Sequence, residues 1–444
     1  MFGGVDFLER ASEAVAGWRE PAPSHPALTP DPERFEAAWG EFVERMGRNY
    51  PFHHPRYAGQ MLKPPHPVAI AAYTAALHVN ANNHALDGGP ETSAMEVEVM
   101  AWLARMFGFP EEALGHLTSS GTIANLEALW VARELHPGKA IVHGANAHYT
   151  HSRMCAVLGV RAFEAPATIA GRLDMDAVEA LCQTGEVGTV VVTAGSTGTG
   201  TVDDVARAVA LRERYGVRVH VDAAYGGFFT LLAKYSPPLV PAAPFLAIAQ
   251  ADSVVVDPHK HGLQPYGCGA VLFRDPSVGR LYKHDSPYTY FTSGDLHLGE
   301  ISLECSRAGA AAAALWLTLK ALDLEPILSA GVRAAHQWAG LIAACDVLTL
   351  HREPELDILT YFPTGTKASE IDAASARVLD AGMASDDPVF LSTLRIDREA
   401  FAAAHPQVEM DLDGVRVLRS VLMKPEHEVF VPWLHERVTA IARR

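Results

Sequence analysis

The sequence predicts an α/β protein with a mostly parallel central sheet, followed by a smaller α+β domain. Short apolar runs rich in β-branched residues alternate with helical patterns through the middle of the chain, and four more strand-like runs follow near its C-terminal end. Continuous apolar strands joined by helical crossovers are typical of parallel sheets with both faces covered. The expected strands are 140–143, 189–193, 217–222, 253–257 and 269–273 in the sheet and 347–350, 358–361, 390–394 and 415–418 in the smaller domain.

The chain divides into three expected parts. Residues 1–60 hold proline-rich loops around a helical pattern at 32–46, and we expect them to form an arm that lies on a larger body. Residues 61–322 form the large domain, which ends in an alanine-rich helix. Residues 323–444 form the small domain, and its last helix is expected at 430–442.

Composition and charge argue against several classes of function. The 444 residues are 49% hydrophobic and 20% charged, as in a large globular protein. A formal net charge of −16 argues against nucleic acid or an anionic membrane as the main partner, although a locally positive site can still bind a small anion. No apolar run reaches the length of a membrane span, and the first residues lack the pattern of a signal peptide. The five cysteines are widely spaced without a C-x-x-C pair, which favours reduced thiols and a cytoplasmic protein.

The segment 253–262 carries the most informative residue. Its β-branched run predicts a buried strand that stops at Pro258, and Lys260 follows with a histidine on either side. A lysine at a strand end, near cationic or apolar groups, can lose its proton, and only the neutral amine attacks an aldehyde. Lys260 therefore suits a Schiff base with a carbonyl cofactor. The alternative is a surface lysine that follows a strand.

Residues 118–122, with the sequence T-S-S-G-T, come directly before a helical pattern. Hydroxyl residues cap helices, so a plain N-cap explains them. Glycine beside hydroxyls at a helix start also directs backbone amides at a phosphate. Ser120, Gly121 and Thr122 are therefore candidate phosphate ligands.

Asp222 ends the apolar strand 217–222 and is followed by small residues. Open α/β sheets bind their ligands at the carboxyl ends of strands. A carboxylate there would keep a pyridine nitrogen protonated by charge pairing, and Ala224 leaves room for a flat ring. The alternative is an aspartate that caps a helix.

His148 follows the expected strand at 140–143. Its ring suits either stacking on an aromatic ligand or capping of the loop. The spacing of His143, His148 and His151 also permits a metal site, but no carboxylate or cysteine completes a plausible set nearby, so we expect no metal.

Residues 193–200 end another strand, with glycines in the order G-x-x-G-x-G. This is the wrong order for a dinucleotide loop, which argues against a nicotinamide enzyme. Ser196 and Thr197 are better explained as hydroxyl donors to a ligand that lies across the strand ends.

Taken together, the motifs S-S-G-T, A-H-Y, G-S-T, H-V-D-A-A-Y-G-G and D-P-H-K-H-G resemble those of one family in order and spacing. The family is the group II pyridoxal-5′-phosphate decarboxylases, which includes aromatic amino acid, tyrosine and glutamate decarboxylases. The likeness runs from the H-P-R-Y segment at 54–57 into the small domain. It implies the type I aminotransferase-like fold, an amino acid as substrate, and a homodimer with its site at the subunit interface.

The resemblance also implies roles for the candidate residues. Lys260 looks like the Schiff-base lysine and Asp222 like the partner of the pyridinium nitrogen. His148 would stack on one face of the ring and Ala224 would pack on the other. The remaining expected cofactor contacts are Ser120, Gly121, Thr122, Thr197, Asp257 and His259.

Substrate recognition is expected from other segments. Arg307, in the segment L-E-C-S-R, is similar to a family arginine near the substrate carboxylate, although a structural ion pair explains it equally well. Asn83 and His84 suit a polar side chain, whereas an aromatic pocket would draw on the N-terminal arm and Tyr73. We expect an aromatic or acidic amino acid.

The implied reaction converts an L-amino acid to an amine and carbon dioxide, through an external aldimine and a quinonoid intermediate. Transamination, oxygen-dependent aldehyde formation and carbon–carbon cleavage use the same cofactor and stay open. A catalytically silent relative is expected to lack the lysine or the aspartate, and both are present.

One departure from the family concerns the loop 286–299. The family places a catalytic tyrosine on a mobile loop, and the aligned residue here is Leu296. Tyr288, Tyr290 or His297 would then supply the proton that the carbanion needs, with His148 and Lys260 as further candidates. Impaired protonation would instead favour aldehyde formation. The loop resembles that of the microbial tyrosine/aspartate decarboxylase and sphingosine-phosphate lyase branch.

Overall fold

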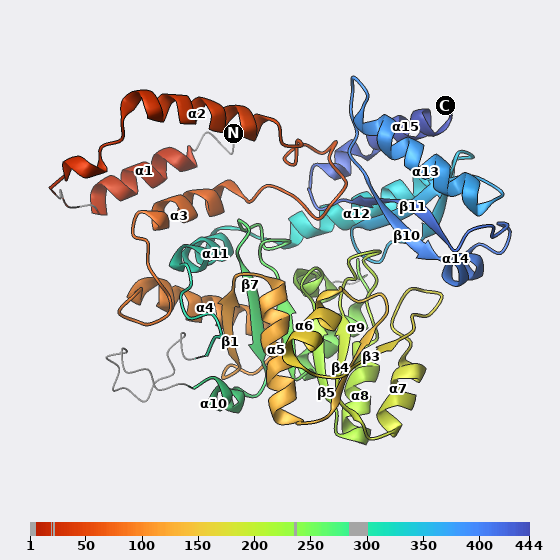
Figure 1. The fold of residues 1–444 in the computed structure, drawn as a ribbon, viewed down its shortest axis with the longest axis horizontal. Coiled ribbons are helices and arrows are strands. Elements are labelled where there is room, and N and C mark those ends of the chain that lie inside the picture. Colours follow the sequence, from red (N-terminus) through yellow and green to blue (C-terminus); the bar gives the residue numbers. More distant parts are fainter. Residues whose placement is uncertain (1–5, 19, 21–22, 235–237, 284–300) are drawn as a thin grey trace.

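The computed structural model describes residues 6–18, 20, 23–234, 238–283 and 301–444. Its larger sheet has seven strands in the order β1-β7-β6-β5-β4-β2-β3 (Figure 1). Strands β3, β2, β4, β5 and β6 are parallel, and β7 runs antiparallel to both β6 and β1. The bounds are Leu114–Thr118 (β1), Ala140–Gly144 (β2), Ala162–Ala165 (β3), Val187–Thr193 (β4), Arg218–Asp222 (β5), Ser253–Val256 (β6) and Gly269–Phe273 (β7). The mostly parallel sheet predicted from the sequence is confirmed.

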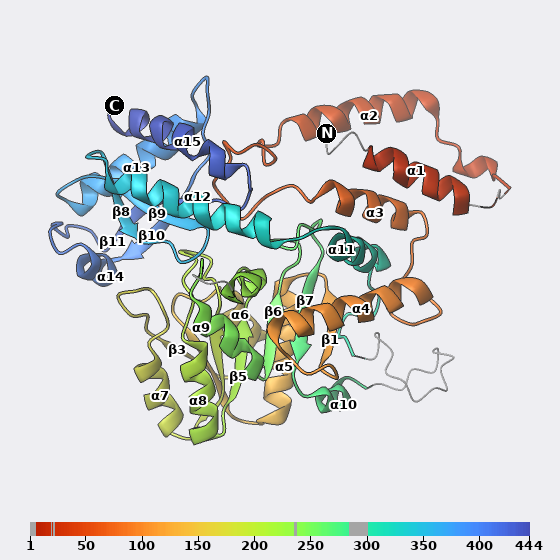
Figure 2. The ribbon, with the colours of Figure 1, turned by 180° about the vertical axis from the view of Figure 1, so that it is seen from behind.

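Helices cover both faces of this sheet, which explains why most positions of its strands are buried. Val191 packs with α5 and α6 on one face, whereas its neighbours Val190 and Val192 pack with α4, α7, α8 and α9 on the other. Helix α5 lies in front of the sheet in Figure 1, and α4, α8 and α9 lie in front of it in Figure 2. The bounds are Pro90–Phe107 (α4), Gly121–Leu135 (α5), Thr150–Leu158 (α6), Met175–Gln183 (α7), Val205–Tyr215 (α8), Ala242–Ala247 (α9) and Gly279–Tyr282 (α10).

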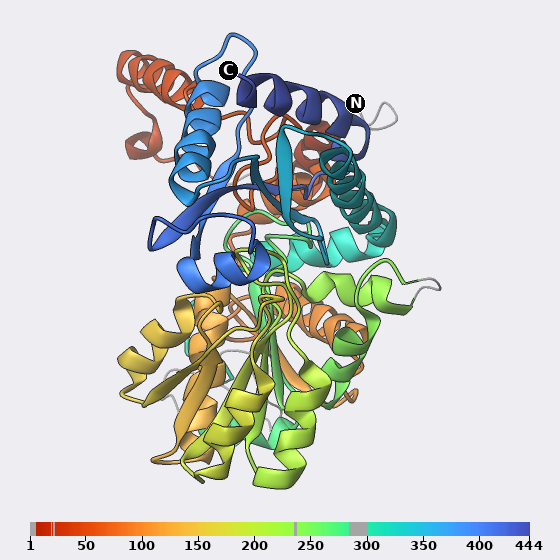
Figure 3. The ribbon, with the colours of Figure 1, turned by 90° about the vertical axis from the view of Figure 1, so that its right-hand side faces the viewer.

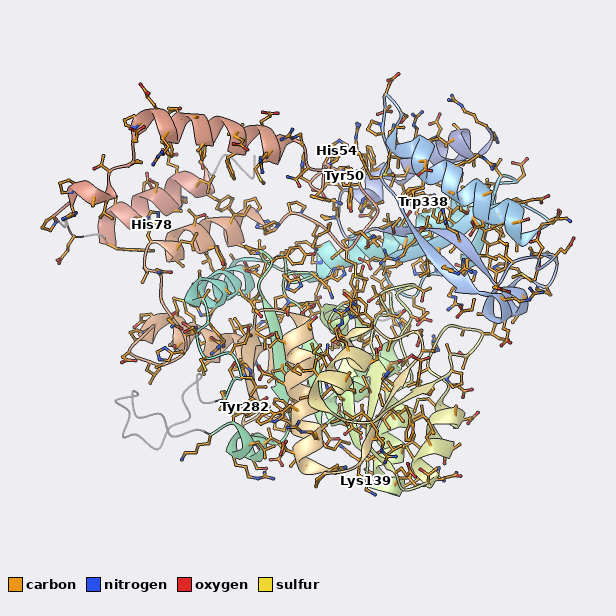
Figure 4. All side chains as sticks on the ribbon, in the orientation of Figure 1. Tyr50, His54, His78, Lys139, Tyr282 and Trp338 are labelled. Carbon is orange, nitrogen blue, oxygen red and sulfur yellow. The ribbon has the colours of Figure 1, made fainter. Side chains whose placement is uncertain are left out.

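A second, antiparallel sheet has the order β10-β11-β9-β8 and lies above the larger one in Figure 3. Its core includes the fully buried Trp338, which Figure 4 labels. The strands are Leu348–Arg352 (β8), Ile358–Pro363 (β9), Ser392–Asp397 (β10) and Gly414–Val421 (β11). The helices that follow residue 301 are Gly309–Ala321 (α11), Glu325–Ala343 (α12), Ala368–Met383 (α13), Arg398–Ala404 (α14) and His427–Ala442 (α15). The smaller α+β unit is thus confirmed, whereas the exact domain boundaries stay predictions.

Three helices precede the large sheet: α1 (Phe7–Trp18), α2 (Pro32–Gly47) and α3 (Pro67–Leu77). Helix α1 packs against α3 through Ala11, Ala71 and Ala75. Helix α2 projects along the top of the molecule in Figures 1 and 2, and none of its residues is buried against the described part of the chain. Within the arm, α1 therefore packs on its own chain, whereas α2 does not bury a residue against the described part of it.

No described helix is both long enough and apolar enough to span a membrane.

Candidate active site

Lys260 lies in the turn that follows β6, and a carboxylate from the same turn holds its amine. Nζ of Lys260 lies 2.9 Å from Oδ2 of Asp257. Burial lowers the pKa of the Lys260 amine, but the carboxylates of Asp257 and Asp222 outweigh burial, and the pKa is raised above the ordinary lysine value. The expectation that nearby groups remove this proton is therefore wrong, because the nearest partner of the amine is an anion.

The start of α5 lies beside this pair. Ser120 is the N-cap, and its Oγ accepts the backbone N–H of Ile123 at 3.3 Å. Gly121 begins the helix so close to Asp257 that an added Cβ would lie 2.6 Å from Oδ2. Thr122 follows with an exposed side chain. The three predicted phosphate ligands thus lie at the N-terminus of a 15-residue helix, where partial positive charge favours an anion.

Asp222 ends β5, one strand away from Lys260, as the pairing of Asp222 with Val255 of β6 shows. Its Oδ2 lies 2.8 Å from Nε2 of His151, and its Oδ1 accepts the backbone N–H of Ala224 at 3.1 Å. Burial raises the pKa of this carboxyl group, but the hydrogen bond and charge of His151 outweigh burial, and the pKa is lowered. Asp222 is therefore a buried, ionised carboxylate.

His148 lies in the loop that leads into α6. Its Nδ1 lies 2.6 Å from Oγ1 of Thr150. Burial is the main cause that lowers the pKa of His148, while Asp222 opposes the change and Lys260 adds to it. The charges of Asp222 and Lys260 thus both act on His148. Because its pKa is lowered, the ring is neutral at neutral pH.

His259 and Ala224 lie beside the two carboxylates of the site, Asp257 and Asp222. His259 donates from Nδ1 to the carbonyl oxygen of Cys268 at 2.7 Å, and its Nε2 lies 3.5 Å from Oδ2 of Asp257. Ala224 is half-buried next to Asp222. The structure thus gathers most of the predicted cofactor contacts at the carboxyl ends of β5 and β6.

The hydroxyls expected from the loop after β4 have different surroundings. Ser196 is buried, and its Oγ lies 3.0 Å and 2.8 Å from the hydroxyls of Thr199 and Thr201. It is therefore engaged within its own loop, which argues against donation to a ligand. Thr197 is exposed, and its carbonyl oxygen accepts a hydrogen bond from Nη2 of Arg419 at 2.7 Å.

Arg307 and Asn83 belong to an internal network around Glu96. Arg307 donates from Nη1 to Glu96 and to the carbonyl of Leu117, and from Nη2 to the carbonyl of Asn83. The Asn83 amide donates to Oε2 of Glu96 at 2.7 Å and is 1% exposed. This arrangement favours the structural ion pair for Arg307 over a carboxylate anchor, and it removes Asn83 from the residues that can reach a substrate. His84 is half-buried.

Sequence reasoning did not single out two residues that contact predicted site residues, His151 beside Asp222 and Arg419 beside Thr197. His151 had a signal, because it lies only three residues after His148. Arg419 had none, since it lies on β11 in the smaller sheet without a local motif.

Some predictions cannot be placed. The loop 286–299, with Tyr288, Tyr290, Leu296 and His297, lies outside the described residues. Among the residues that are described, no three histidine, cysteine, aspartate or glutamate side chains group as metal ligands do.

The arrangement fits pyridoxal 5′-phosphate. It offers an amine for an aldehyde, a helix N-terminus for a phosphate, an ionised carboxylate for a ring nitrogen and an imidazole for a ring face. The buried Oδ1 of Asp257 has no hydrogen-bond partner among the described residues, which indicates a polar ligand or water beside it.

Comparison with known proteins agrees with this chemistry. Residues 50–360 match the family described as the pyridoxal-dependent decarboxylase conserved domain. A probable L-tyrosine/L-aspartate decarboxylase from Methanopyrus kandleri is 35% identical over 270 residues, which cover 60% of this chain and 70% of the relative. An L-aspartate/L-glutamate decarboxylase from Pyrococcus horikoshii is 28% identical over 75% of this chain and 86% of the relative.

Solved structures support the fold. The crystal structure of Oryza sativa TDC with PLP and tryptamine has a TM-score of 0.80 at 16% identity, covering 98% of this chain and 97% of that one. The crystal structure of mouse CSAD has a TM-score of 0.78 at 19% identity, covering 98% and 91%. The type I fold predicted from the sequence is confirmed. Because the family match spans well over half of its residues, the chain belongs to the pyridoxal-dependent decarboxylases, enzymes that use pyridoxal 5′-phosphate as carboxy-lyases.

Proposed function

We propose that the protein decarboxylates an aromatic or acidic L-amino acid to its amine and carbon dioxide. The observation that carries this proposal is the meeting of Lys260, Asp222 and the N-terminus of α5 at one edge of the sheet. Bound pyridoxal phosphate supplies an aldehyde for amines and a ring that accepts the electron pair left by carbon dioxide. The intermediates expected from the sequence belong to this proposal.

Each residue of the site has a proposed task. The amine of Lys260 would hold the aldehyde carbon of the cofactor. Asp222 holds a proton on the ring nitrogen by charge pairing. Ser120, Gly121 and Thr122 hold the phosphate, with Asp257, His259 and Thr197 nearby. His148 covers one face of the ring and Ala224 the other.

Arg419 is the proposed anchor for the substrate carboxylate in place of Arg307. It is 4% exposed and donates to Gly59, Thr197 and Gly198 carbonyl oxygens and to Oγ of Ser392. Within the described ranges no carboxylate lies within ion-pair distance of its guanidinium. A buried cation with only neutral acceptors, beside the loop that carries Thr197, favours a small anion as its partner.

A homodimer is part of the proposal, and α2 supports it. Five large apolar side chains, each about half exposed, follow one another at helical spacing along α2, and they are Phe35, Trp39, Phe42, Val43 and Met46. Such a stripe normally faces a core. Because no residue of α2 is buried against the part of the chain that the structure describes, we propose that it lies on a second copy.

The cytoplasmic location stays a prediction. It is supported by the five free cysteines.

Amine detection tests the reaction. Purified protein with pyridoxal phosphate is incubated with each amino acid, and carbon dioxide and amine are measured, with Lys260→Ala as the control. Equal amounts of both products from one substrate class support the proposal. A keto acid, an aldehyde with ammonia, or two carbon fragments would each point to one of the alternative reactions.

A further inference from the structure

Among the described residues, His151 is the only one whose side chain forms a hydrogen bond with the carboxylate of Asp222. It is fully buried, and its Nε2 lies 2.8 Å from Oδ2 of the aspartate. Two other buried imidazoles lie nearby, but both have other partners. Nδ1 of His143 lies 3.1 Å from the carbonyl oxygen of Gly144. His220 is engaged on both nitrogens, at 2.9 Å each, by the hydroxyl of Ser253 and the side-chain oxygen of Asn125.

The start of α6 places two histidines at one site. His148 lies in the loop two residues before the helix, and His151 is the second residue of the helix. The amide N–H of His151 donates to the carbonyl of His148 at 3.1 Å, which fixes this turn. A single helical turn thus presents one imidazole to the proposed ring face and another to the carboxylate behind it.

The polar environment decides which proton His151 carries. Its Nδ1 is buried without a hydrogen-bond partner among the described residues. An ionised carboxylate only accepts hydrogen bonds, so the 2.8 Å contact requires a proton on Nε2, and Nε2–H donates to Asp222. The carboxylate therefore keeps its negative charge and receives a directed hydrogen bond.

Without His151, little else would keep the carboxylate of Asp222 ionised and oriented. Burial alone would drive the carboxyl group to take up a proton. The remaining contact is the backbone N–H of Ala224 on Oδ1, and Lys260 acts only through longer-range charge. A neutral or rotated carboxyl group could not pair with a protonated ring nitrogen.

We propose that His151 is a positioning residue, which orients the carboxylate of Asp222 and keeps it ionised for the pyridine nitrogen of the cofactor. This inference rests on the proposed role of Asp222. The hydrogen bond is charge-assisted and shielded from water, so its loss should be felt at the cofactor.

The test compares three holoenzymes: wild type, His151→Leu and His151→Gln. Leucine removes the N–H donor, whereas glutamine keeps one. For His151→Leu we expect about tenfold weaker retention of pyridoxal phosphate, measured by dialysis against graded cofactor concentrations. We also expect a shifted pH dependence of the absorbance of the bound cofactor, and a fall in kcat with little change in KM. His151→Gln should recover part of each effect.

His143→Gln is the matched control, because it changes a buried histidine of the same group that does not touch Asp222. Its thermal stability can fall, but its spectrum and cofactor retention should match wild type. If His151→Leu does not fold, the glutamine variant alone decides, and a pH titration displaced from wild type supports the inference.

Asp222→Asn separates the inference from the proposed function. If this variant retains the cofactor and its spectrum like wild type, the proposed role of Asp222 fails. If Asp222→Asn disturbs both while the His151 variants match wild type, only the role of His151 is overturned.

Discussion

The amine of Lys260 and the first residue of α5, Gly121, lie on two sides of one carboxylate. Asp257 pairs with Nζ of Lys260 at 2.9 Å, and its oxygens leave no room for a side chain at Gly121. Asp257 therefore borders both the proposed Schiff base and the proposed phosphate site. A change on either side of Asp257 is expected to affect the other.

Gly121→Ala tests whether Asp257 links the two sites. The added methyl group would lie 2.6 Å from Oδ2 and 2.7 Å from Oδ1 of Asp257, so the carboxylate or the helix start must move. We expect cofactor retention to weaken by about tenfold, because a misplaced helix N-terminus loses hydrogen bonds to a charged phosphate. Equilibrium dialysis of the holoenzyme measures this.

Gly40→Ala is the control for Gly121→Ala. An added Cβ at Gly40 meets nothing within 4 Å, and alanine favours the helix. This variant should bind the cofactor normally. Normal cofactor binding by Gly121→Ala as well would contradict the link between the two sites through Asp257.

Arg307 and Arg419 should respond differently to substitution. Arg307→Met leaves the buried Glu96 without its ion pair, so we expect a loss of about 3–5 kcal/mol in the free energy of unfolding. The KM of the folded fraction should change little. Urea unfolding and steady-state kinetics together make the measurement.

Arg419→Lys keeps the charge but loses the planar arrangement of donors. We expect KM to rise by about tenfold or more if this guanidinium binds the substrate carboxylate. A large KM effect at Arg307, with none at Arg419, would restore the anchor first expected from the sequence.

Helix α2 supplies the prediction on assembly. Trp39→Glu places a charge in the apolar stripe, and we expect the dimer to dissociate or weaken in light scattering after gel filtration. Ala37→Glu is the matched control, since residue 37 is exposed and lies on the opposite face of the helix. Equal masses for both variants and wild type would argue that α2 does not form the interface.

The sequence predicted the elements that carry a repeated apolar signal. Strands β2, β4, β5, β6 and β7 are runs of buried β-branched residues, and all five were found. Strands β1 and β3 were missed. The first contains glycine and histidine, and the second is four residues long with two exposed positions at the sheet edge, so neither shows the pattern of a buried strand.

The site was predictable where its residues stand next to one another in motifs. Lys260, Asp222 and the residues of α5 fall in this class. Contacts between distant segments were not predictable. His151 and Asp222 are 71 positions apart and meet only through the fold, and the pairing of Arg307 with Glu96 spans 211 positions. The error over the Lys260 proton has a different origin, because its nearest partner, Asp257, lies only three positions away and the motif does not show that the carboxylate turns toward the amine.

Buried histidines predict a loss of stability in acid. Burial, with Arg352 and His405 as further causes, lowers the pKa of His351 from 6.5 to about 3. The unfolded chain binds a proton at His351 below pH 6.5, whereas the folded chain does so only near pH 3. As the pH is lowered from 6.5 to about 3, the free energy of unfolding therefore decreases by about 1.4 kcal/mol per pH unit for this group.

His351→Gln removes this contribution, so urea unfolding between pH 6 and pH 4 should show a shallower slope by about that amount. Two buried carboxyl groups act in the opposite direction, because the pKa of Asp203 and that of Asp357 are raised to about 6, mainly by burial. Their contribution is the same in both proteins, so the difference between slopes reports His351 together with its hydrogen-bond partner His405. The exposed His78, changed to glutamine, serves as the control and should leave the slope as in wild type. Equal slopes for all three proteins would mean that His351 takes up its proton without unfolding the small domain.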